Sequence, residues 1–220
     1  MDSKTESIEI AGLQFFGQIS ASISHEIKNV LAIINENAGL LEDFTVMADR
    51  GMPIDPARLK AMAGAVKKQI GRADVILKNM NRFAHSIDQP FTVVDLTQTI
   101  ELIVSLTARF ADMRGVKVDL QLPEKEVIFK TAPYLLMNLL WLCLDFSMSA
   151  SGDEKRVELV AEETKEGLRI QIRRLSNLSE ALSESFPSER EKHLLEMLAA
   201  DLTIEVEREE IELRIGRIAV

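Results

Sequence analysis

The sequence is poor in the residues that build disulfides and metal sites. It contains one cysteine and three histidines in 220 residues. Cys143 lies inside the apolar run LMNLLWLCLDF, which indicates a buried thiol rather than a disulfide or a metal ligand. The histidines are scattered, and no His/Cys cluster has the spacing of a metal site. We therefore expect neither a disulfide framework nor a protein-bound metal.

Long apolar runs and an excess of basic charge are also missing. No apolar run approaches the ~20 residues of a membrane span, and the opening MDSKTESIEI lacks the basic-then-apolar order of a signal peptide. Lys and Arg number 26 against 35 Asp and Glu, and the resulting net charge of -9 disfavours nucleic acid as a partner. At 46% hydrophobic residues the chain can bury one large core or two smaller ones. We expect a cytoplasmic protein that binds neither nucleic acid nor membrane.

The first third of the chain has the periodicity of two long helices. Apolar residues recur every three or four positions over 8–48 and again over 59–87, which is typical of helices with one buried face. The segment DRGMPID interrupts the pattern, and Asp55 followed by Pro56 favours a new helix start. An antiparallel hairpin is therefore predicted. Two copies would bury both stripes in a four-helix bundle, so we predict a homodimer; the alternative is a hairpin that packs only against the rest of its own chain.

The remainder of the chain alternates strands and helices. Two pairs of segments, RVELVAEE with LRIQIRRL and LTIEVE with IELRIGRI, are predicted β-hairpins. The glutamates of 205–212 alternate with apolar residues, so we expect them on a solvated strand face. The fold class is α+β, with a helical hairpin over 1–89 and a mixed sheet with helices on one face over 90–220. Further strands are predicted at 91–96, GVKVDLQL and EVIFK, and helices at 97–114, 133–149 and 189–200.

One histidine lies on the open side of the first helix. At about 100° per residue, His25 lies roughly 160° from Ile23 and Ile27 and points away from the apolar stripe. Glu26 adjoins it and Asn29 follows one turn later; an acid can bias the imidazole tautomer, and an amide can position water. By this pattern alone an ordinary surface histidine is the commoner case. Its other helical neighbours are Ala21, Ser22, Lys28, Ala32 and Glu36.

Three segments of the chain match the motifs of one family in order and spacing. SHEIKN, followed by LAII and AGLLED, looks like the H-box of the dimerisation and phosphoacceptor domain of sensor histidine kinases. FTVVDLTQTIELIVSLTARFADMRGVKVDLQLP is similar to the start of the kinase ATP-binding domain, and TAPYLLMNLLWLCLDFSMSAS resembles its N-box helix. The likeness covers nearly the whole chain, and the H-box is its specific part. It implies a phosphoacceptor hairpin over 1–89 and a kinase-like ATPase α/β sandwich over 90–220.

The segments that hold ATP in these kinases are degenerate. Leu142 stands where the N-box has an asparagine that binds Mg-ATP, and leucine offers no oxygen to Mg²⁺. Arg173 and Arg174 stand about where an Asp-x-Gly-x-Gly word belongs, none of the ten glycines forms a Gly-x-Gly pair, and the ATP lid is missing. The chain thus resembles the ChpT-like dimeric histidine phosphotransferases of bacterial phosphorelays. This resemblance implies a pseudokinase with no bound nucleotide and with Mg²⁺ brought only by a receiver partner.

The resemblance also implies roles for the residues around His25. The receiver of an upstream hybrid kinase would bring an aspartyl phosphate, the imidazole would accept the phosphoryl group, and a response regulator would take it. Glu26 would orient the ring, and Asn29 could position water if the chain were instead a receiver phosphatase. A third possibility is an inactive homodimer that only sequesters a receiver or kinase. The expected docking residues are Ala21, Ser22, Lys28 and Ala32 on the first helix and Lys78, Asn79 and Arg82 on the second.

Two aromatic residues and two histidines remain outside this expected site. Trp141 and Phe146 are expected in the core of the kinase-like domain or, alternatively, in the former nucleotide pocket. His85 and His193 are expected to be ordinary surface or boundary residues, and neither is assigned a function.

Overall fold

The chain divides by its internal contacts into two compact units. One comprises residues 20–82, and the other comprises residues 1–19 together with 83–220. The computed structural model describes residues 3–165, 167–182 and 186–216, with side chains from residue 10 onward. The division differs from a single boundary at residue 89, because residues 1–19 and 83–89 group with the residues that carry the sheet.

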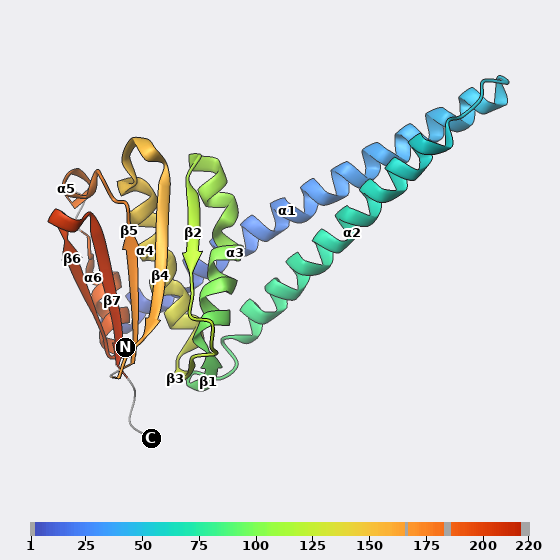
Figure 1. Cartoon of the computed structure of the whole chain (residues 1–220). Coiled ribbons are helices and arrows are strands. Elements are labelled where there is room, and N and C mark those ends of the chain that lie inside the picture. The colour runs from blue at the N-terminus through green and yellow to red at the C-terminus, as the bar shows by residue number, and fades with distance from the viewer. Residues whose placement is uncertain (1–2, 166, 183–185, 217–220) are drawn as a thin grey trace. The chain divides into compact units, whose positions relative to one another are not determined.

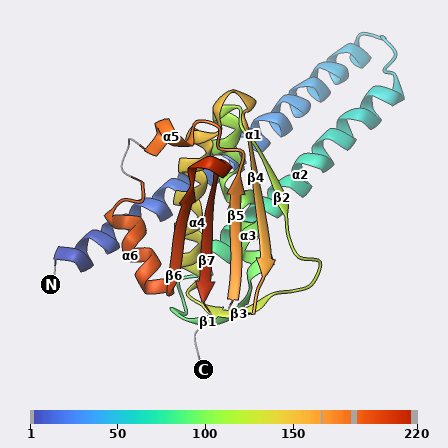
Figure 2. The ribbon, with the colours of Figure 1, turned by 60° about the vertical axis from the view of Figure 1, so that its left-hand side comes forward.

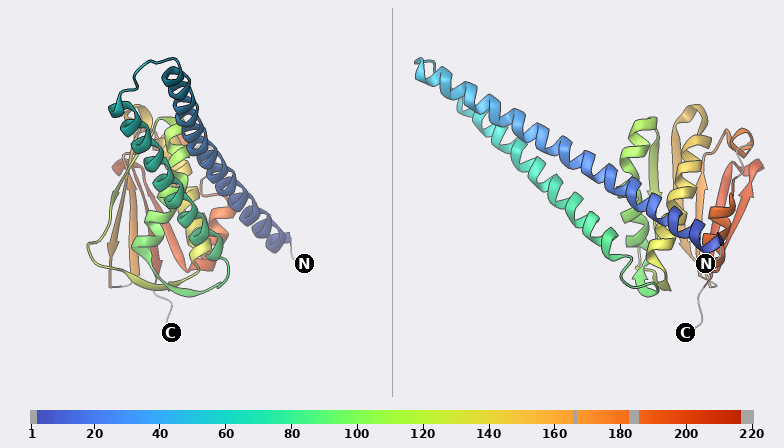
Figure 3. Two further views of the ribbon diagram at one scale, coloured as in Figure 1. Left: turned by 90° about the vertical axis from the view of Figure 1, so that its right-hand side faces the viewer. Right: turned by 180° about the vertical axis from the view of Figure 1, so that it is seen from behind.

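The first unit is built from most of two antiparallel helices. α1 spans Ser3–Asp49 and α2 spans Pro56–His85; Figure 1 shows them side by side with a short turn between them, and Figure 3 shows the same hairpin from two further sides. The predicted start of the second helix is confirmed, since the Asp55 carboxylate accepts a hydrogen bond from the backbone N–H of Ala57 at 2.8 Å. Gly51 turns the chain with a φ of +79°, which glycine adopts without strain.

The second unit is built on a five-stranded mixed sheet. Its strand order is β2-β4-β5-β7-β6, with β2 parallel to β4 and the other neighbours antiparallel. A separate antiparallel ribbon joins β1 to β3. The two hairpins predicted from the sequence are β4–β5 and β6–β7. The strands are β1 (Thr92–Asp95), β2 (Lys117–Gln121), β3 (Ile128–Thr131), β4 (Arg156–Glu163), β5 (Gly167–Arg173), β6 (Ala200–Glu205) and β7 (Glu210–Gly216).

Helices cover one face of this sheet. α3 and α4 lie behind it in Figure 2, and α6 packs beside α4. The Asp95 carboxylate caps α3 by accepting from the backbone N–H of Thr97 at 3.0 Å. α4 is buried on nearly every side, as its apolar composition predicts. The α+β fold class is therefore confirmed. The helices are α3 (Leu96–Arg114), α4 (Pro133–Ala150), the single turn α5 (Leu178–Ala181) and α6 (Glu189–Leu198).

The core of this unit lies between the helical layer and the inner face of the sheet. Alternate residues of the central strands point inward, and Leu159, Ile170 and Leu213 are at most 3% exposed. Leu140 and Leu144 of α4 are equally buried. Burial of one such side chain contributes about 1.5–3 kcal/mol, so the sheet and α4 carry much of the stability of the unit.

The first turns of α1 are part of the same core. Phe15 is fully buried, and its ring centroid lies 5.4 Å from that of Phe83 and 5.5 Å from that of Tyr134. The Tyr134 hydroxyl donates a hydrogen bond to the backbone carbonyl of Gly12 at 2.5 Å. A buried phenol needs such a partner. No local sequence pattern predicts this packing, which joins residues 122 positions apart.

The expectation about the outer face of the sheet is wrong in part. The sequence pattern places the glutamates of 205–212 on a solvated face, but Glu210 and Glu212 are each only 7% exposed. The Gln171 amide donates to the Glu212 carboxylate at 3.1 Å, and Arg173 Nε lies 3.4 Å from a Glu210 oxygen. Arginine stems lying along the strands cover the carboxylates while their charged ends neutralise them. Alternation alone cannot tell this polar network from a solvated face.

Candidate functional site

His25 lies on the exposed side of α1. Ala21, Lys28, Asn29 and Ala32, which share its side of the helix, are also exposed. No side chain in the described part of the chain hydrogen-bonds or ion-pairs with the imidazole. The ring nitrogens are therefore open to a partner, as the helical periodicity predicts.

Glu26 points toward α2 rather than toward the histidine. Its Oε2 lies 3.6 Å from Arg72 Nη2, with the Glu26 side chain 19% and the Arg72 side chain 53% exposed. Successive residues of a helix are about 100° apart and do not face each other. The expected contact of Glu26 with the imidazole is therefore replaced by an ion pair between the two helices. Arg72 was not singled out in the sequence analysis.

Ser22 differs from the open position expected of a docking residue. It is only 3% exposed, and its hydroxyl is buried without a hydrogen-bond partner among the described residues. Ser22 lies one turn before Glu26, on the side of α1 that also carries the buried Ile23. We therefore remove Ser22 from the surface that a partner can reach.

The expected docking residues of α2 lie at a different level of the hairpin. If the two helices were level at the turn, position 26 of α1 would lie opposite position 79 of α2. The ion pair instead joins Glu26 to Arg72. At 1.5 Å per residue, Lys78 and Arg82 lie roughly 9 and 15 Å further along α2 than Arg72. The two helices are staggered by about two turns, and only an inter-helix contact reveals such a stagger. Lys78 and Arg82 are exposed, whereas Asn79 is half-buried.

The three residues of the degenerate nucleotide site are not brought together as a binding site. Leu142 is half-buried on α4. Arg173 lies on the outer face of β5, where its guanidinium donates to the Gln171 side chain at 2.6 Å. Arg174 follows with a φ of +70° and pairs with Glu154 at 3.1 Å. Each arginine is therefore committed to a neighbour, and Arg173 lies on the face opposite the helical layer.

A buried polar cluster joins α4, α6 and the first turns of α1. The Arg190 guanidinium donates to the Asn138 side chain and to the backbone carbonyl of Ala11, each at 3.0 Å. Asn138 is 2% exposed. Burial lowers the pKa of the Arg190 guanidinium, and the nearby Glu191 carboxylate opposes this effect. The side-chain amide of Asn138, the first asparagine of the N-box-like helix, is thus already hydrogen-bonded to Arg190 of the same chain.

Trp141 and Phe146 of α4 each pack against another aromatic ring. Trp141 is buried, and its ring lies 4.8 Å from the ring of Phe110. Phe146 stacks on Phe186 with a centroid distance of 3.9 Å. Trp141 is therefore core, as expected, and Phe146 packs against the segment that precedes α6.

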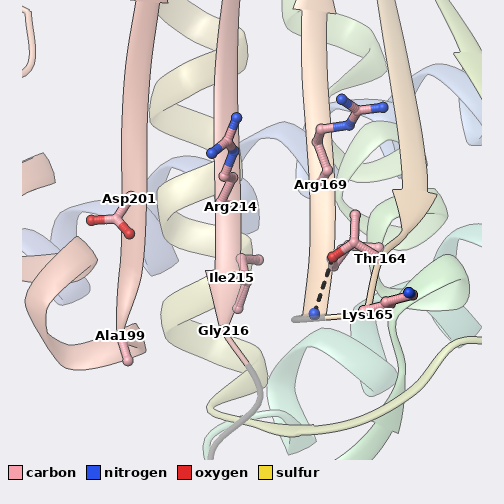
Figure 4. A pocket seen from close by; sticks show the side chains of 10 residues that line it. Thr164, Lys165, Arg169, Ala199, Asp201, Arg214, Ile215 and Gly216 are labelled. Carbon is pink, nitrogen blue, oxygen red and sulfur yellow. Dashed lines mark hydrogen bonds between the residues drawn. The ribbon is translucent and has the colours of Figure 1, made fainter.

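A shallow hollow lies at the end of the sheet where β5, β6 and β7 meet (Figure 4). Arg169 pairs with Glu162, and Arg214 pairs with Glu212 at 2.6 Å. Lys165 is the remaining cation of the lining. Its arginines are already neutralised, and the charges that remain in its lining are one cation, Lys165, and one anion, Asp201, so we assign the hollow no role.

The comparisons with known proteins give similarity to solved structures. No protein-family model and no curated protein matches the chain, and no helix in the described residues is long and apolar enough to cross a membrane. The ATP-binding domain of PrrB from Mycobacterium tuberculosis is 18% identical, covers 60% of this chain and 100% of its own, and has a TM-score of 0.48. A structure described as a bacterial phosphotransferase is 18% identical over 91% of this chain and 95% of its own, with a TM-score of 0.47. The histidine kinase ThkA, in complex with the response regulator TrrA, is 15% identical over 94% of this chain and 63% of its own, with a TM-score of 0.47.

Proposed function

We propose that this chain is a histidine phosphotransferase of a bacterial phosphorelay and that His25 is its phosphoacceptor. The observation that carries the proposal is the open imidazole on the helical hairpin, at the centre of an H-box-like word. The phosphoryl group comes from the aspartyl phosphate of a receiver domain and passes to a second receiver. Mg²⁺ arrives with the receiver, since receiver carboxylates supply the oxygen ligands that this cation needs.

The reaction at His25 is an in-line displacement. A neutral ring nitrogen attacks phosphorus, the bond between phosphorus and the aspartyl oxygen breaks, and the aspartate leaves as a carboxylate beside its Mg²⁺. The proton on the other ring nitrogen is released to water. Because the transition state is loose, positioning and charge matter more than covalent assistance from the hairpin.

The sheet unit supports a role without ATP. Leu142 has no oxygen for Mg²⁺, and the amide of Asn138 accepts a hydrogen bond from Arg190. Phe146 is stacked on Phe186. These contacts support a pseudokinase domain that leaves phosphate supply to another protein, and we propose a cytoplasmic phosphorelay as its setting.

The hairpin supports a homodimer. Residues of the predicted apolar stripes remain about half exposed in the single chain, among them Leu41 (48%), Ile70 (49%) and Leu77 (47%). Apolar stripes of this length rarely stay open to water. We propose that a second copy covers them in a four-helix bundle.

The test is phosphotransfer from phosphorylated receivers of the source organism to the purified chain and to its His25→Gln variant. We expect acid-labile label on the wild type, none on the variant, and retained receiver binding by both. His85→Gln is the matched control, because His85 is an exposed histidine of α2 whose Nδ1 lies 2.8 Å from Asp88. Incubation with Mg-ATP alone should give no label.

The same experiment separates the alternative functions. A receiver phosphatase, favoured by the exposed Asn29 one turn after His25, releases inorganic phosphate without labelled histidine. A sequestering pseudokinase binds a receiver without dephosphorylating it and without becoming phosphorylated itself. Label that survives the His25→Gln substitution would contradict the assignment of the phosphoacceptor.

A further inference from the structure

The ion pair between Glu26 and Arg72 joins the two helices directly beside the phosphoacceptor. We propose that Arg72 is a positioning residue for phosphoryl transfer at His25, because it holds the Glu26 carboxylate against α2 and neutralises its charge. This inference rests on the proposed function and deepens it. Glu26, the acid next to His25, is thereby paired with Arg72 on α2 rather than with the imidazole.

The first argument is geometric. Glu26 lies on the buried side of α1 together with Ile23 (4% exposed) and Val30 (1% exposed). A carboxylate on such a side needs a cation or hydrogen-bond donors, since removing it from water is costly. Arg72 Nη2, at 3.6 Å from Glu26 Oε2, supplies that cation. The pair thereby fixes where the negative charge lies relative to the neighbouring His25.

The second argument is electrostatic. A phosphoryl group approaching His25 carries about two negative charges. An unpaired carboxylate one residue away repels that group, and at roughly 7 Å in water the repulsion corresponds to about a five- to ten-fold slower reaction. Within two helical turns of Glu26 or Arg72, the other charged residues are Lys28 on α1 and Lys67, Lys68, Asp74 and Lys78 on α2. In the described part of the hairpin, Arg72 is the cation within ion-pairing distance of Glu26.

The decisive substitution is Arg72→Gln, which keeps a polar side chain and removes the charge. Single-turnover transfer from a phosphorylated receiver should slow about five- to ten-fold at sub-saturating receiver, whereas binding of the unphosphorylated receiver, which carries no phosphoryl charge, should be unchanged. Arg72→Lys should restore the rate. Arg58→Gln removes the same charge from an exposed site of the same helix, fourteen residues or roughly 21 Å away, and should leave the rate unchanged.

A second phosphodonor makes the test independent of any receiver. Phosphoramidate phosphorylates an open imidazole as the phosphorus–nitrogen bond to ammonia breaks and a new one forms to the ring. ³¹P NMR follows the phosphohistidine, with His25→Gln as the blank. Arg72→Gln should slow this reaction as well. If phosphoramidate labels His25 but no receiver does, the proposed function fails, and the Arg72 comparison still decides this inference.

Double substitution identifies the route by which Arg72 acts. If Arg72 works through Glu26, Arg72→Gln in a Glu26→Gln background should cause no further slowing with either donor. Equal slowing in both backgrounds would overturn the proposal and place Arg72 in direct contact with the donor. An unchanged rate for Arg72→Gln in the wild-type background would overturn it too. A wild type that neither donor labels would overturn both this inference and the proposed function.

Discussion

At the scale of single residues, His25 and Cys143 differ in their exposure to solvent. His25 is open to solvent on α1, whereas Cys143 is 1% exposed inside α4. Burial raises the pKa of the Cys143 thiol to about 12, and the nearby Glu191 carboxylate adds to the increase. Because the thiolate is the reactive form, the cysteine is chemically silent at neutral pH while the histidine is available.

Thiol labelling checks this difference. At pH 8 the native chain should react with a thiol-specific disulfide reagent at least a hundred-fold more slowly than the urea-unfolded chain, because pH 8 lies far below the raised pKa. Only at pH near 12 should native and unfolded rates converge. Rapid labelling of the folded protein at pH 8 would show that Cys143 is accessible and contradict the burial.

At the scale of elements, backbone conformation decides which glycines can be replaced. Gly167 begins β5 with a φ of +156°, and a Cβ placed there would lie 1.9 Å from the backbone carbonyl oxygen of Ile215 on β7. Gly64 is a helical glycine of α2 with nothing within 4 Å of an added Cβ. Substitution by alanine should therefore destabilise the protein at Gly167 and stabilise it at Gly64.

Urea unfolding of two alanine variants measures this contrast. Gly167→Ala should lower the free energy of unfolding by about 2–4 kcal/mol, because the sheet must shift to relieve the overlap. Gly64→Ala should raise it by up to about 1 kcal/mol through helix propensity. A Gly167→Ala variant as stable as the wild type would mean that β5 and β7 separate easily at this end.

The inter-helix ion pair also belongs to the scale of elements. The local start of α2 at Asp55–Pro56 was predictable because capping depends on adjacent residues. The pairing of Glu26 with Arg72 was not, because the stagger of two helices is set by packing along their whole length. The burial of Glu210 could not be predicted from the sequence for a similar reason, since it depends on an arginine side chain from the neighbouring strand β5.

At the scale of the whole molecule, the fold class and the exposed histidine could be predicted, while the long-range polar contacts could not. Apolar residues that recur every 3.6 positions predict the helical hairpin, and apolar residues that recur every second position predict most strands. Both patterns arise because one side of each element is buried. The contacts of Arg190 with Ala11 and Asn138 cross 179 and 52 positions of sequence. No local signal specifies such pairs.

The oligomeric state is a property of the whole molecule, and light scattering can test it. We expect the wild type to have about twice the 24.7 kDa mass of one chain by light scattering, since apolar stripes on the hairpin favour a second copy. Leu41→Asp should shift the protein toward the monomer, because it places a charge on the α1 stripe. Met113→Asp, at a 70% exposed site of α3, should not. A wild type that is monomeric at micromolar concentration would contradict the four-helix bundle.

The first turns of α1 have a consequence for how the chain is made. Their partners Tyr134 and Arg190 leave the ribosome more than a hundred residues after Gly12 and Ala11. The first turns of α1 therefore lack these two partners until residue 190 has been synthesised. Burial of Phe15 thus requires segments more than a hundred residues further along the sequence, so a chain that stops before Tyr134 cannot bury Phe15 in the same way.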